Sequence, residues 1–280
     1  MYKLIISSGN NSIDLYNDED IFLINSDGLG IACNINLSEY GMVDGAFYNS
    51  SHIGARHISL NVRFKGDVAM GKKRLFSIIK PHKEVKIRIV TDTVNAVISG
   101  YAESLNIPPN SQKPVGSISI ICPYPFFTEG NTKSEILYGH GGGFKFSQGG
   151  QNFRGVRFGT AKTSQTTLID IDSHIASGGV FVFKFKNTLP SITVRNITSG
   201  KYFTFTYDFQ PGDILTVNTV TGSKAAVLMR GAEEIDLLYA MTGNFIQLEQ
   251  GENELHISSD GIAVEAVSAA VDYDILLAGI

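Results

Sequence analysis

The sequence HISLNVRF, residues 57–64, decides the fold class. Its apolar side chains alternate with polar ones, so that one face of the segment is apolar and the other is polar. A period of two is typical of a half-buried strand. EVKIRIV, residues 84–90, shows the same alternation, and NAVISGYAES, residues 95–104, follows as its pairing partner. The first half of the chain is therefore predicted to be an antiparallel barrel or sandwich.

One helix is predicted between these strands, over residues 70–80. Its basic residues 72–74 are expected to face water, and its apolar residues at helical spacing are Leu75, Phe76 and Ile79. Pro81 ends the helix, since proline lacks the N–H group that a helix needs. A single helix among strands favours a mainly β fold with a small α addition over a parallel α/β sheet.

The composition suits a folded chain with many strands and tight turns. Of the 280 residues, 43% are hydrophobic, 18% are charged and 29 are glycine. The net charge of −4 and the 17 Phe and 11 Tyr exclude an intrinsically disordered chain, which needs a high net charge and few apolar residues. The acidic balance also argues against a protein that binds DNA or RNA by neutralising phosphates, so no sequence-specific nucleic-acid binding is expected.

Two domains are expected from the length and from a change in composition. A glycine-rich stretch, residues 139–155, follows the last predicted strand of the first half. This places the boundary near Glu129, within residues 129–155, and gives domains of residues 1–129 and 130–280. In the second domain, strand patterns recur at spacings of roughly ten residues between turns, which favours a β-sandwich.

The sequence shows no sign of export or of membrane insertion. Its N-terminal apolar run is too short for a signal peptide, and no stretch approaches the roughly 18 apolar residues of a membrane span. Synthesis and folding in the cytoplasm are expected. The two cysteines, Cys33 and Cys122, match no metal-binding spacing, and both are expected to be buried free thiols.

A string that resembles a phosphate-binding P-loop occurs at Gly66–Lys73, which reads GDVAMGKK. The P-loop needs a Ser or Thr hydroxyl for Mg²⁺ after its lysine, and Lys73 stands there instead. The string is also poor in glycine between its ends. No ATP or GTP binding is therefore expected, and no cofactor is implied.

Other groups of residues lack the companions that catalysis needs. His140–Gly143 reads HGGG, as in the oxyanion loop of esterases, but no GxSxG nucleophile motif occurs, so a flexible connection is the favoured interpretation. The histidines show no metal-binding spacing, which leaves a site assembled in space as the alternative; they are His52, His57, His82, His140, His174 and His256. The carboxylates that crowd the last part of the chain are interpreted as solvated, and they are Glu233, Glu234, Asp236, Glu249, Glu252, Glu254 and Asp260. No catalytic, cofactor-binding or metal-binding residue is assigned.

The order of these elements resembles the distal tail proteins, the siphovirus-type tail components of long-tailed phages and prophages. In the first half, the resemblance rests on HISLNVRF, the helix GKKRLFSIIKP, the paired strands, and the closing strand GSISIICPYPFF with Pro125 and Phe126 at its end. In the second half, it rests on GDILTVNTVTGSKAAVL, a predicted hairpin with Thr221 and Gly222 at its turn. It also rests on a Phe-x-x-Leu-x-x-Gly-x-Asn pattern, formed by Phe245, Leu248, Gly251 and Asn253. The glycine-rich stretch has no place in the family pattern.

The resemblance implies a mainly β chain: a tail-tube-like split β-barrel or sandwich with one helix, followed by a galectin-like (carbohydrate-module-like) β-sandwich. It implies a structural virion protein at the tail tip, made in the host bacterial cytoplasm. The first domains would form a hexameric ring with a channel for DNA, and strand edges are natural ring contacts. Expected partners are further copies of the chain, the tail tube protein, the tail-associated baseplate hub protein and receptor-binding proteins. The acidic balance suits a channel wall that repels DNA phosphates.

Two alternatives to this assembly role stay open. The β-sandwich could itself recognise cell-wall sugars through exposed aromatic residues such as Tyr202, Phe203 or Tyr239. The absence of tryptophan weakens that hypothesis, and alternating aromatic residues are more typical of a core. A tail-borne glycosidase would need two carboxylates that flank a cleft, and no motif with that geometry is recognised. The expected function is assembly, and no enzyme activity is predicted.

Overall fold

The computed structural model describes residues 2–108, 114–140, 161–162, 165–260 and 267–280. The chain divides into two compact units. The first unit comprises Met1–Gly130 and Leu276–Ile280, and the second comprises Asn131–Ile275. The expected second domain included residues 276–280, whereas the structure groups them with the first unit. We call residues 276–280 the return segment.

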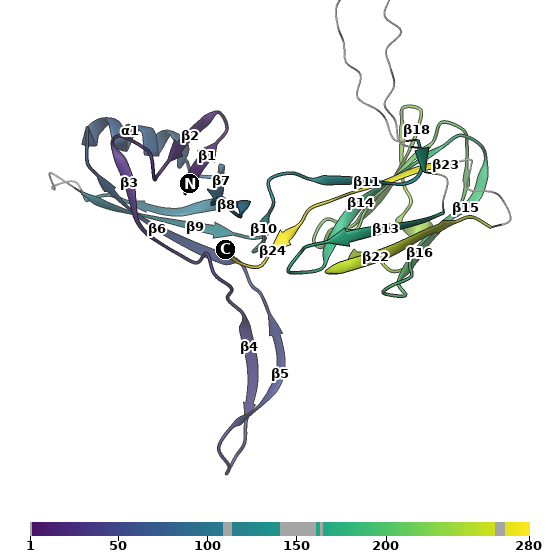
Figure 1. Cartoon of the computed structure of the whole chain (residues 1–280), viewed down its shortest axis with the longest axis horizontal. Helices are drawn as coiled ribbons and strands as arrows, with labels where there is room; N and C mark the ends of the chain where they lie inside the picture. The colour runs from purple at the N-terminus through teal and green to yellow at the C-terminus, as the bar shows by residue number, and fades with distance from the viewer. Residues whose placement is uncertain (1, 109–113, 141–160, 163–164, 261–266) are drawn as a thin grey trace, which may run out of the picture. The chain divides into compact units, whose positions relative to one another are not determined.

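The first unit is built on an open antiparallel sheet with the strand order β2-β1-β7-β8-β9-β6-β3 (Figure 1). Its strands are β1 (Lys3–Ser8), β2 (Asn11–Asp14), β3 (Ile21–Asp27), β6 (Arg56–Phe64), β7 (Glu84–Val90), β8 (Asn95–Asn106) and β9 (Val115–Cys122). Two short strands continue this sheet: β10 (Phe127–Thr128) pairs with β8, and β24 (Leu276–Leu277) pairs with β10. The antiparallel pairing of β7 with β8 confirms the sequence prediction.

Alternation along β6 places one of its faces in the core of the first unit. Ile58, Leu60, Val62 and Phe64 are fully buried, while the residues between them are exposed or half-buried. The apolar residues of β7 are buried in the same alternating way. The period-two pattern is therefore confirmed in both strands, and burial of these apolar faces drives the folding of the sheet.

The helix α1 (Val68–Ile78) begins two residues earlier than predicted. Asp67 caps it, because its carboxylate accepts hydrogen bonds from the backbone N–H groups of Ala69 at 2.9 Å and Met70 at 3.1 Å. These N–H groups have no partner within the helix, so the cap stabilises its first turn. The helix ends before Pro81, as predicted.

Only part of the predicted apolar face of α1 is buried. Of the three predicted residues, Leu75 and Ile79 are buried, but Phe76 is 55% exposed, so its assignment to the buried face was wrong. Successive helical residues point about 100° apart, and Phe76 therefore leaves the face that Leu75 occupies. Arg74 was predicted to face water, and in the structure it also forms an ion pair with the carboxylate of Asp18.

The second unit is a β-sandwich of two antiparallel sheets (Figure 1). One sheet has the order β12-β11-β23-β14-β17-β18-β19, with β21 paired to β14, and the other has the order β13-β22-β15-β16-β20. The strands of the larger sheet are β11 (Lys133–His140), β12 (Ala161–Lys162), β14 (Ser177–Phe185), β17 (Ile214–Asn218), β18 (Ala225–Arg230), β19 (Glu233–Asp236), β21 (Gln247–Leu248) and β23 (Val267–Tyr273). The strands of the smaller sheet are β13 (Thr166–Ile171), β15 (Leu189–Asn196), β16 (Tyr202–Phe209), β20 (Met241–Gly243) and β22 (Gly251–Ser258). A short 3-10 helix, η1 (Leu238–Ala240), precedes β20.

Phenylalanine rings from both sheets form the core of the sandwich. The ring centroids of Phe181 on β14 and Phe203 on β16 lie 5.3 Å apart, and Phe185 stacks on Phe209 at 4.2 Å. The predicted hairpin is present as β17 and β18, with Gly222 at a φ of 89° in its turn. The predicted class, mainly β with one α-helix and a sandwich in the second half, is confirmed in the residues that the structure describes.

A further strand pair, absent from the sequence prediction, leaves the first unit between β3 and β6. β4 (Asn34–Glu39) pairs with β5 (Ala46–His52), and the two extend away from the main sheet (Figure 1). We call residues 34–52 the arm. Residues 28–33 lead from β3 into β4, and we call them the base loop.

Candidate assembly surface

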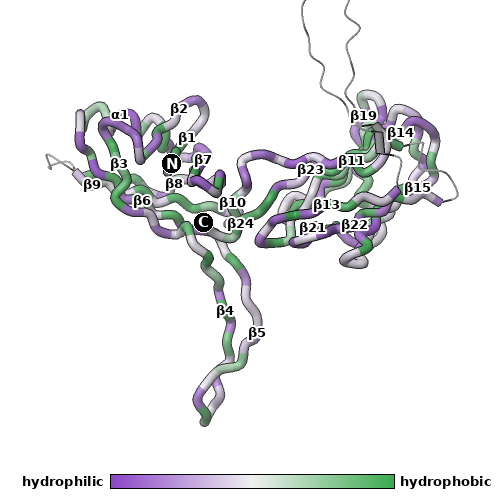
Figure 2. Tube along the Cα trace, in the orientation of Figure 1, coloured by the Kyte–Doolittle hydropathy of each residue, from purple (hydrophilic) through white to green (hydrophobic). Residues whose placement is uncertain are grey.

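The arm is exposed along its whole length. Every residue of β4 and β5 is exposed, and hydrophobic positions occur on both strands and at the tip (Figure 2). Its large exposed apolar residues are Ile35, Leu37, Tyr40, Met42, Val43, Phe47 and Tyr48. Met42, in the turn, is 100% exposed. A monomeric protein rarely leaves a contiguous apolar surface of this kind in water, so the arm is a candidate contact surface for another chain.

The pairing register gives the arm one apolar face. Leu37 pairs with Tyr48, and Ile35 lies two residues before Leu37, so the three side chains point to the same side. Ser51, the partner of Ile35, has its hydroxyl 2.8 Å from the Tyr48 hydroxyl, which agrees with this orientation. We call the side formed by Ile35, Leu37 and Tyr48 the apolar face of the arm.

The opposite side of the arm is polar near Ser38 and Asn49 and aromatic towards the tip. The Asn49 side-chain amide donates a hydrogen bond to the Ser38 hydroxyl at 2.7 Å. Towards the tip, the rings of Tyr40 and Phe47 make an edge-to-face contact with centroids 6.2 Å apart. These contacts hold the two strands together, but a two-stranded ribbon alone is only marginally stable in water. A partner that covers the apolar face would therefore stabilise the arm.

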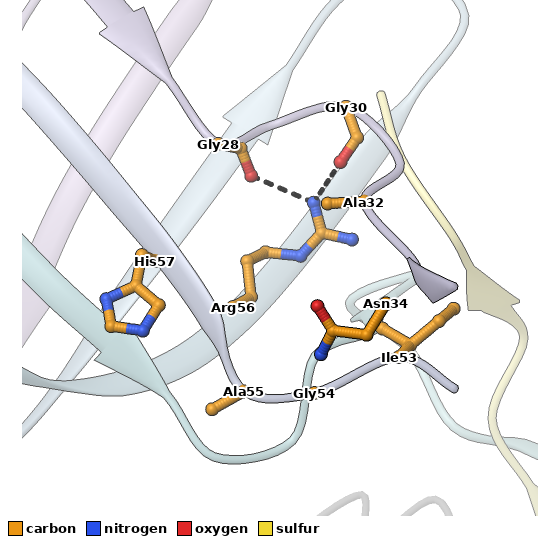
Figure 3. A pocket seen from close by; sticks show the side chains of 9 residues that line it. All are labelled: Gly28, Gly30, Ala32, Asn34, Ile53, Gly54, Ala55, Arg56 and His57. Atoms are coloured by element: carbon orange, nitrogen blue, oxygen red, sulfur yellow. Dashed lines mark hydrogen bonds between the residues drawn. The ribbon is translucent and has the colours of Figure 1, made fainter. Parts of the chain in front are cut away.

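Arg56, the first residue of β6, lies at the base of the arm and is 7% exposed. Its Nη1 donates hydrogen bonds to the carbonyl oxygens of Gly28 at 2.9 Å and Gly30 at 2.6 Å, both in the base loop (Figure 3). A cavity of about 270 Å³ borders Arg56, and Asn34 and Ile53 also line it. Burial lowers the pKa of Arg56, but a guanidinium stays protonated at neutral pH. Sequence reasoning singled out neither Arg56 nor the arm.

The GDVAMGKK string is part of the helix and its cap. Gly71, the second glycine of the string, lies inside α1 and is buried. A Cβ atom at Gly71 would lie 2.9 Å from the ring of Phe64, so glycine is required here for close packing of the helix on β6. The second glycine of the string is thus explained by packing, and the absence of nucleotide binding stays a prediction.

The other sequence candidates are spread over the two units. Gly141–Gly143, and with them most of the HGGG string and of the glycine-rich stretch, lie outside the described residues. Within the described ranges, no three His, Cys, Asp or Glu side chains gather in a geometry that could hold a metal ion. His52 lies on the arm and His57 on β6, whereas His256 on β22 has its Nδ1 3.1 Å from the Thr166 hydroxyl. Of the acidic residues, Glu233, Glu234 and Asp236 lie on β19, whereas Glu252 and Glu254 lie on β22, the strand of His256.

The two cysteines have different environments. Cys122 is buried at the end of β9, and burial raises the pKa of its thiol to about 11. Cys33 is exposed in the base loop, so its prediction as a buried thiol was wrong. The reason is that the base loop leads into the arm, outside the core of the sheet. Both thiols are free.

The three aromatic residues considered for sugar binding do not form one surface. Phe203 is fully buried in the core of the sandwich, which excludes it as a stacking platform. Tyr202 is 38% exposed and Tyr239 is 75% exposed. The Tyr202 ring lies under the guanidinium of Arg195, with Cζ 5.0 Å from the ring centroid.

The Phe-x-x-Leu-x-x-Gly-x-Asn pattern has a structural explanation. Asn253 is buried, and its side-chain oxygen accepts a hydrogen bond from the backbone N–H of Glu249 at 2.9 Å. Its amide nitrogen donates to the carbonyl oxygens of Glu249 at 2.7 Å and Gly251 at 3.0 Å. Gly251 adopts a φ of 87°, a conformation that glycine takes without strain. The pattern therefore marks a turn that is fastened by one asparagine, with Leu248 buried beside it.

Comparison with known proteins gives a family match within the second unit and fold matches over nearly the whole chain. Residues 172–269 match the family model of the siphovirus-type tail component, C-terminal domain. The fold matches the crystal structure of the SPP1 Dit protein, described as a paradigm of the hub adsorption apparatus in phages that infect Gram-positive bacteria. That match has a TM-score of 0.68 at 11% identity and covers 99% of each chain. A chain of the phage P2 baseplate in its activated conformation with Ca matches with a TM-score of 0.50 at 11% identity, over 97% of this chain and 98% of that one.

No curated protein sequence matches the chain. The resemblance to siphovirus-type tail components is nevertheless confirmed, because the family model matches residues 172–269 and the chain shares the fold of the SPP1 Dit protein. In the described part of the chain, no helix is long and apolar enough to cross a membrane.

Proposed function

Since this chain carries the siphovirus-type tail component domain over residues 172–269, we propose that it is a structural hub at the distal end of a phage tail. In this function, six copies form a ring through their first units. The ring joins the tail tube protein above it to the tail-associated baseplate hub protein below it and leaves a channel for DNA. The second units stand at the periphery, where receptor-binding proteins attach. The protein acts in the virion at the tail tip, after synthesis in the bacterial cytoplasm, and its mechanism is assembly and not catalysis.

The exposed arm is the observation that carries this proposal. Its apolar face, formed by Ile35, Leu37 and Tyr48, has no cover from the described residues of its own chain. A closed ring needs a contact in which one surface of a copy meets a different surface of the next. The arm provides the first of these two surfaces, because it reaches beyond the sheet to which it is attached (Figure 1). Burial of its apolar face against the neighbouring copy would supply free energy for ring closure.

The distribution of charge refines the expectation about the channel. Acidic and basic residues balance in the sequence of the first unit, so the net charge of −4 comes from residues 131–275. A ring of first units would therefore be close to neutral as a whole. A neutral ring lacks the net positive charge that would hold DNA phosphates, so it would let DNA slide.

The test is the native mass in solution, measured by light scattering coupled to size exclusion over a range of concentrations. A ring of six 30.4 kDa chains has a mass of about 182 kDa. The double variant Leu37→Ser, Tyr48→Ser removes two of the three side chains of the apolar face, and we expect it to remain a folded 30.4 kDa monomer. Leu168→Ser is the matched control, since Leu168 is 63% exposed on β13 of the second unit, and it should leave the mass of the ring unchanged.

A wild-type protein that stays monomeric at all concentrations would contradict self-assembly through the arm. A ring that survives the double variant would show that another surface closes it. Negative-stain images of the large species distinguish a closed ring from an open aggregate of similar mass.

A second candidate function, the binding of cell-wall sugars, is favoured by one row of residues on the smaller sheet. Tyr202, Arg195, His256 and Thr166 are register partners across four neighbouring strands. An exposed ring beside several hydrogen-bonding groups is the arrangement that sugar recognition uses. Glycan-array binding by the wild type that is lost in Tyr202→Ala and kept in Tyr239→Ala would support this function, and an empty array would remove it.

A further inference from the structure

The return segment lies against the base loop, from which the arm starts. Its strand β24 pairs with β10, and the backbone N–H of Ile280 donates a hydrogen bond to the carbonyl oxygen of Leu29 at 3.1 Å. Leu276, Leu277 and Ala278 are buried. Residues from the end of this sequence therefore form part of the surface that supports the arm.

Arg56 connects the return segment to the base loop. Its Nη1 donates to the carbonyl oxygens of Gly28 and Gly30, and its Nη2 donates to the carbonyl oxygen of Ala278. Its Nε donates to the carbonyl oxygen of Pro125 at 2.6 Å, in the link between β9 and β10. The guanidinium is planar and rigid, so one side chain fixes the relative positions of three chain segments.

The guanidinium depends on these carbonyl groups. It lies over the ring of Phe127, with Cζ 4.9 Å from the ring centroid, and its four acceptors are all backbone oxygens. Without Ala278, a charged N–H group at a buried site would lose its acceptor, which is unfavourable. The cavity beside Arg56 gives the side chain room to turn towards water. Such a turn would break its hydrogen bonds to Gly28 and Gly30 and release the base loop.

Gly279 brings the two backbones into direct contact. A Cβ atom at this position would lie 3.1 Å from the carbonyl carbon of Gly30 and 3.1 Å from the backbone nitrogen of Ile31. Most Cβ atoms have no neighbour so close, and a bulkier side chain would push the base loop away. The glycine thus allows the return segment to lie flat against the loop.

We propose that the return segment is a latch for the arm. Through Arg56 and the close contact at Gly279, it holds the base loop and sets the direction in which the arm leaves the first unit. Arg56 is a positioning residue of the assembly surface, since it acts through the base loop. The consequence for ring formation rests on the proposed function, whereas the latch itself is a property of a single chain.

Cys33 provides a natural reporter for the latch. It is exposed at the end of the base loop, next to β4, whereas Cys122 is buried and its thiol pKa is raised to about 11. A thiol-specific nitroxide therefore labels Cys33 in the folded protein. The electron paramagnetic resonance spectrum then reports the mobility of the base loop on the nanosecond scale. The Leu37→Ser, Tyr48→Ser chain is the background for this measurement, so that ring formation does not immobilise the label.

Three changes release the latch in this background. Deletion of residues 276–280 removes it, Arg56→Lys replaces the planar fork by a single ammonium, and Gly279→Val separates the two backbones. For each, we expect loss of the immobile component of the spectrum and a gain of a mobile one. Leu4→Ala is the control, because Leu4 is buried in the same unit away from the latch, and its spectrum should stay that of the parent chain.

An immobile label in the deletion chain would overturn the latch. An equal gain of mobility in Leu4→Ala would also overturn it, because a general loss of stability would then explain the effect. If Arg56→Lys fails to fold, the deletion and Gly279→Val decide. Light scattering of the same three changes in the wild-type arm should show loss of the 182 kDa species, about six times the mass of one chain. If the wild type forms no ring, the proposed function fails, while the spectra still decide the latch.

Discussion

Asp213 and Arg230 form an ion pair that fastens one turn of the second unit. Asp213 is 2% exposed, and its two carboxylate oxygens accept hydrogen bonds from Arg230 Nε at 3.0 Å and Nη2 at 2.7 Å. The backbone N–H of Gln210 donates a third bond to this carboxylate at 2.9 Å. The hydrogen bonds from Arg230 lower the pKa of Asp213 below its ordinary value, and burial offsets this only in part.

This pair should make the stability of the second unit depend on pH. A carboxyl group whose pKa is lower in the folded state stabilises the fold above its unfolded pKa of about 4, and loses that contribution as the pH falls through the folded pKa. Asp213→Asn should therefore cost about 2 kcal/mol in the free energy of unfolding at pH 7. Below pH 4, the difference between wild type and variant should shrink. Urea unfolding of both proteins at several pH values measures this difference in the free energy of unfolding.

The control for this measurement is Asp44→Asn, at the exposed tip of the arm. It should leave the free energy of unfolding of the second unit unchanged, because Asp44 lies in the first unit. A constant difference between wild type and Asp213→Asn from pH 7 to strong acid would contradict the role given to the charge of Asp213.

Among the elements, α1 depends on a cap that its own sequence provides. Asp67→Ala removes the acceptor for the N–H groups of Ala69 and Met70 and should lower the free energy of unfolding of the first unit by about 1 kcal/mol. Asp67→Ser keeps an acceptor at this position and should restore most of the loss. Thermal unfolding followed by circular dichroism compares the three proteins, and equal midpoints for all three would show that the cap contributes nothing.

The strands of the main sheet were predictable because apolar and polar residues alternate along them in the sequence. In β6 and β7, buried residues alternate with exposed or half-buried ones, and both strands were found from the sequence alone. Phe76 and Cys33 were misplaced because a single residue has no period, and its exposure depends on what packs around it. In the second unit, the alternation in β16 correctly indicated that Phe203 belongs to the core.

The arm could not be found from the same kind of pattern. None of its strand residues is buried in the chain, so nothing in the fold of a single copy requires its apolar residues to alternate. The available signal for the arm in the sequence was Met42 and Val43, two apolar residues between turn residues. Both are exposed in the structure, because no core lies beside them. If the arm contacts another chain, as proposed, its apolar residues pack there and follow no pattern set by the core of their own chain.

At the scale of the whole molecule, each unit has a core of its own. The cluster of buried apolar residues between the two sheets of the sandwich belongs entirely to residues 131–275. We therefore expect two thermal transitions in calorimetry of the monomeric arm variant. Phe205→Ala should lower the stability of the second unit by about 3–5 kcal/mol and shift only its transition, because Phe205 is fully buried there.

The matched change in the first unit is Leu60→Ala, at a fully buried position of β6. It should destabilise that unit by about 2–5 kcal/mol and leave the other transition in place. A single transition that moves with both substitutions would instead show that the two cores unfold together.

The contacts of Arg56 that hold the base loop could not be predicted from the sequence. Its acceptors lie in the base loop, at Pro125 and at Ala278, and no local spacing connects positions so far apart in the chain. The sequence around Arg56 reads only as the start of a strand. Only the three-dimensional return of residues 276–280 to the first unit brings these groups together.

Because residues 276–280 pack on the first unit, the first unit can be completed only after the second unit has been synthesised. The ribosome produces the base loop and the arm first, and it adds residues 276–280 only after the whole second unit, on the order of tens of seconds later at bacterial rates of elongation. During this interval, the nascent first unit lacks β24 and cannot complete its sheet. A chain released early by an interrupted ribosome would keep an unsupported arm. In the proposed ring, only copies whose translation has passed through the second unit would then present a supported arm.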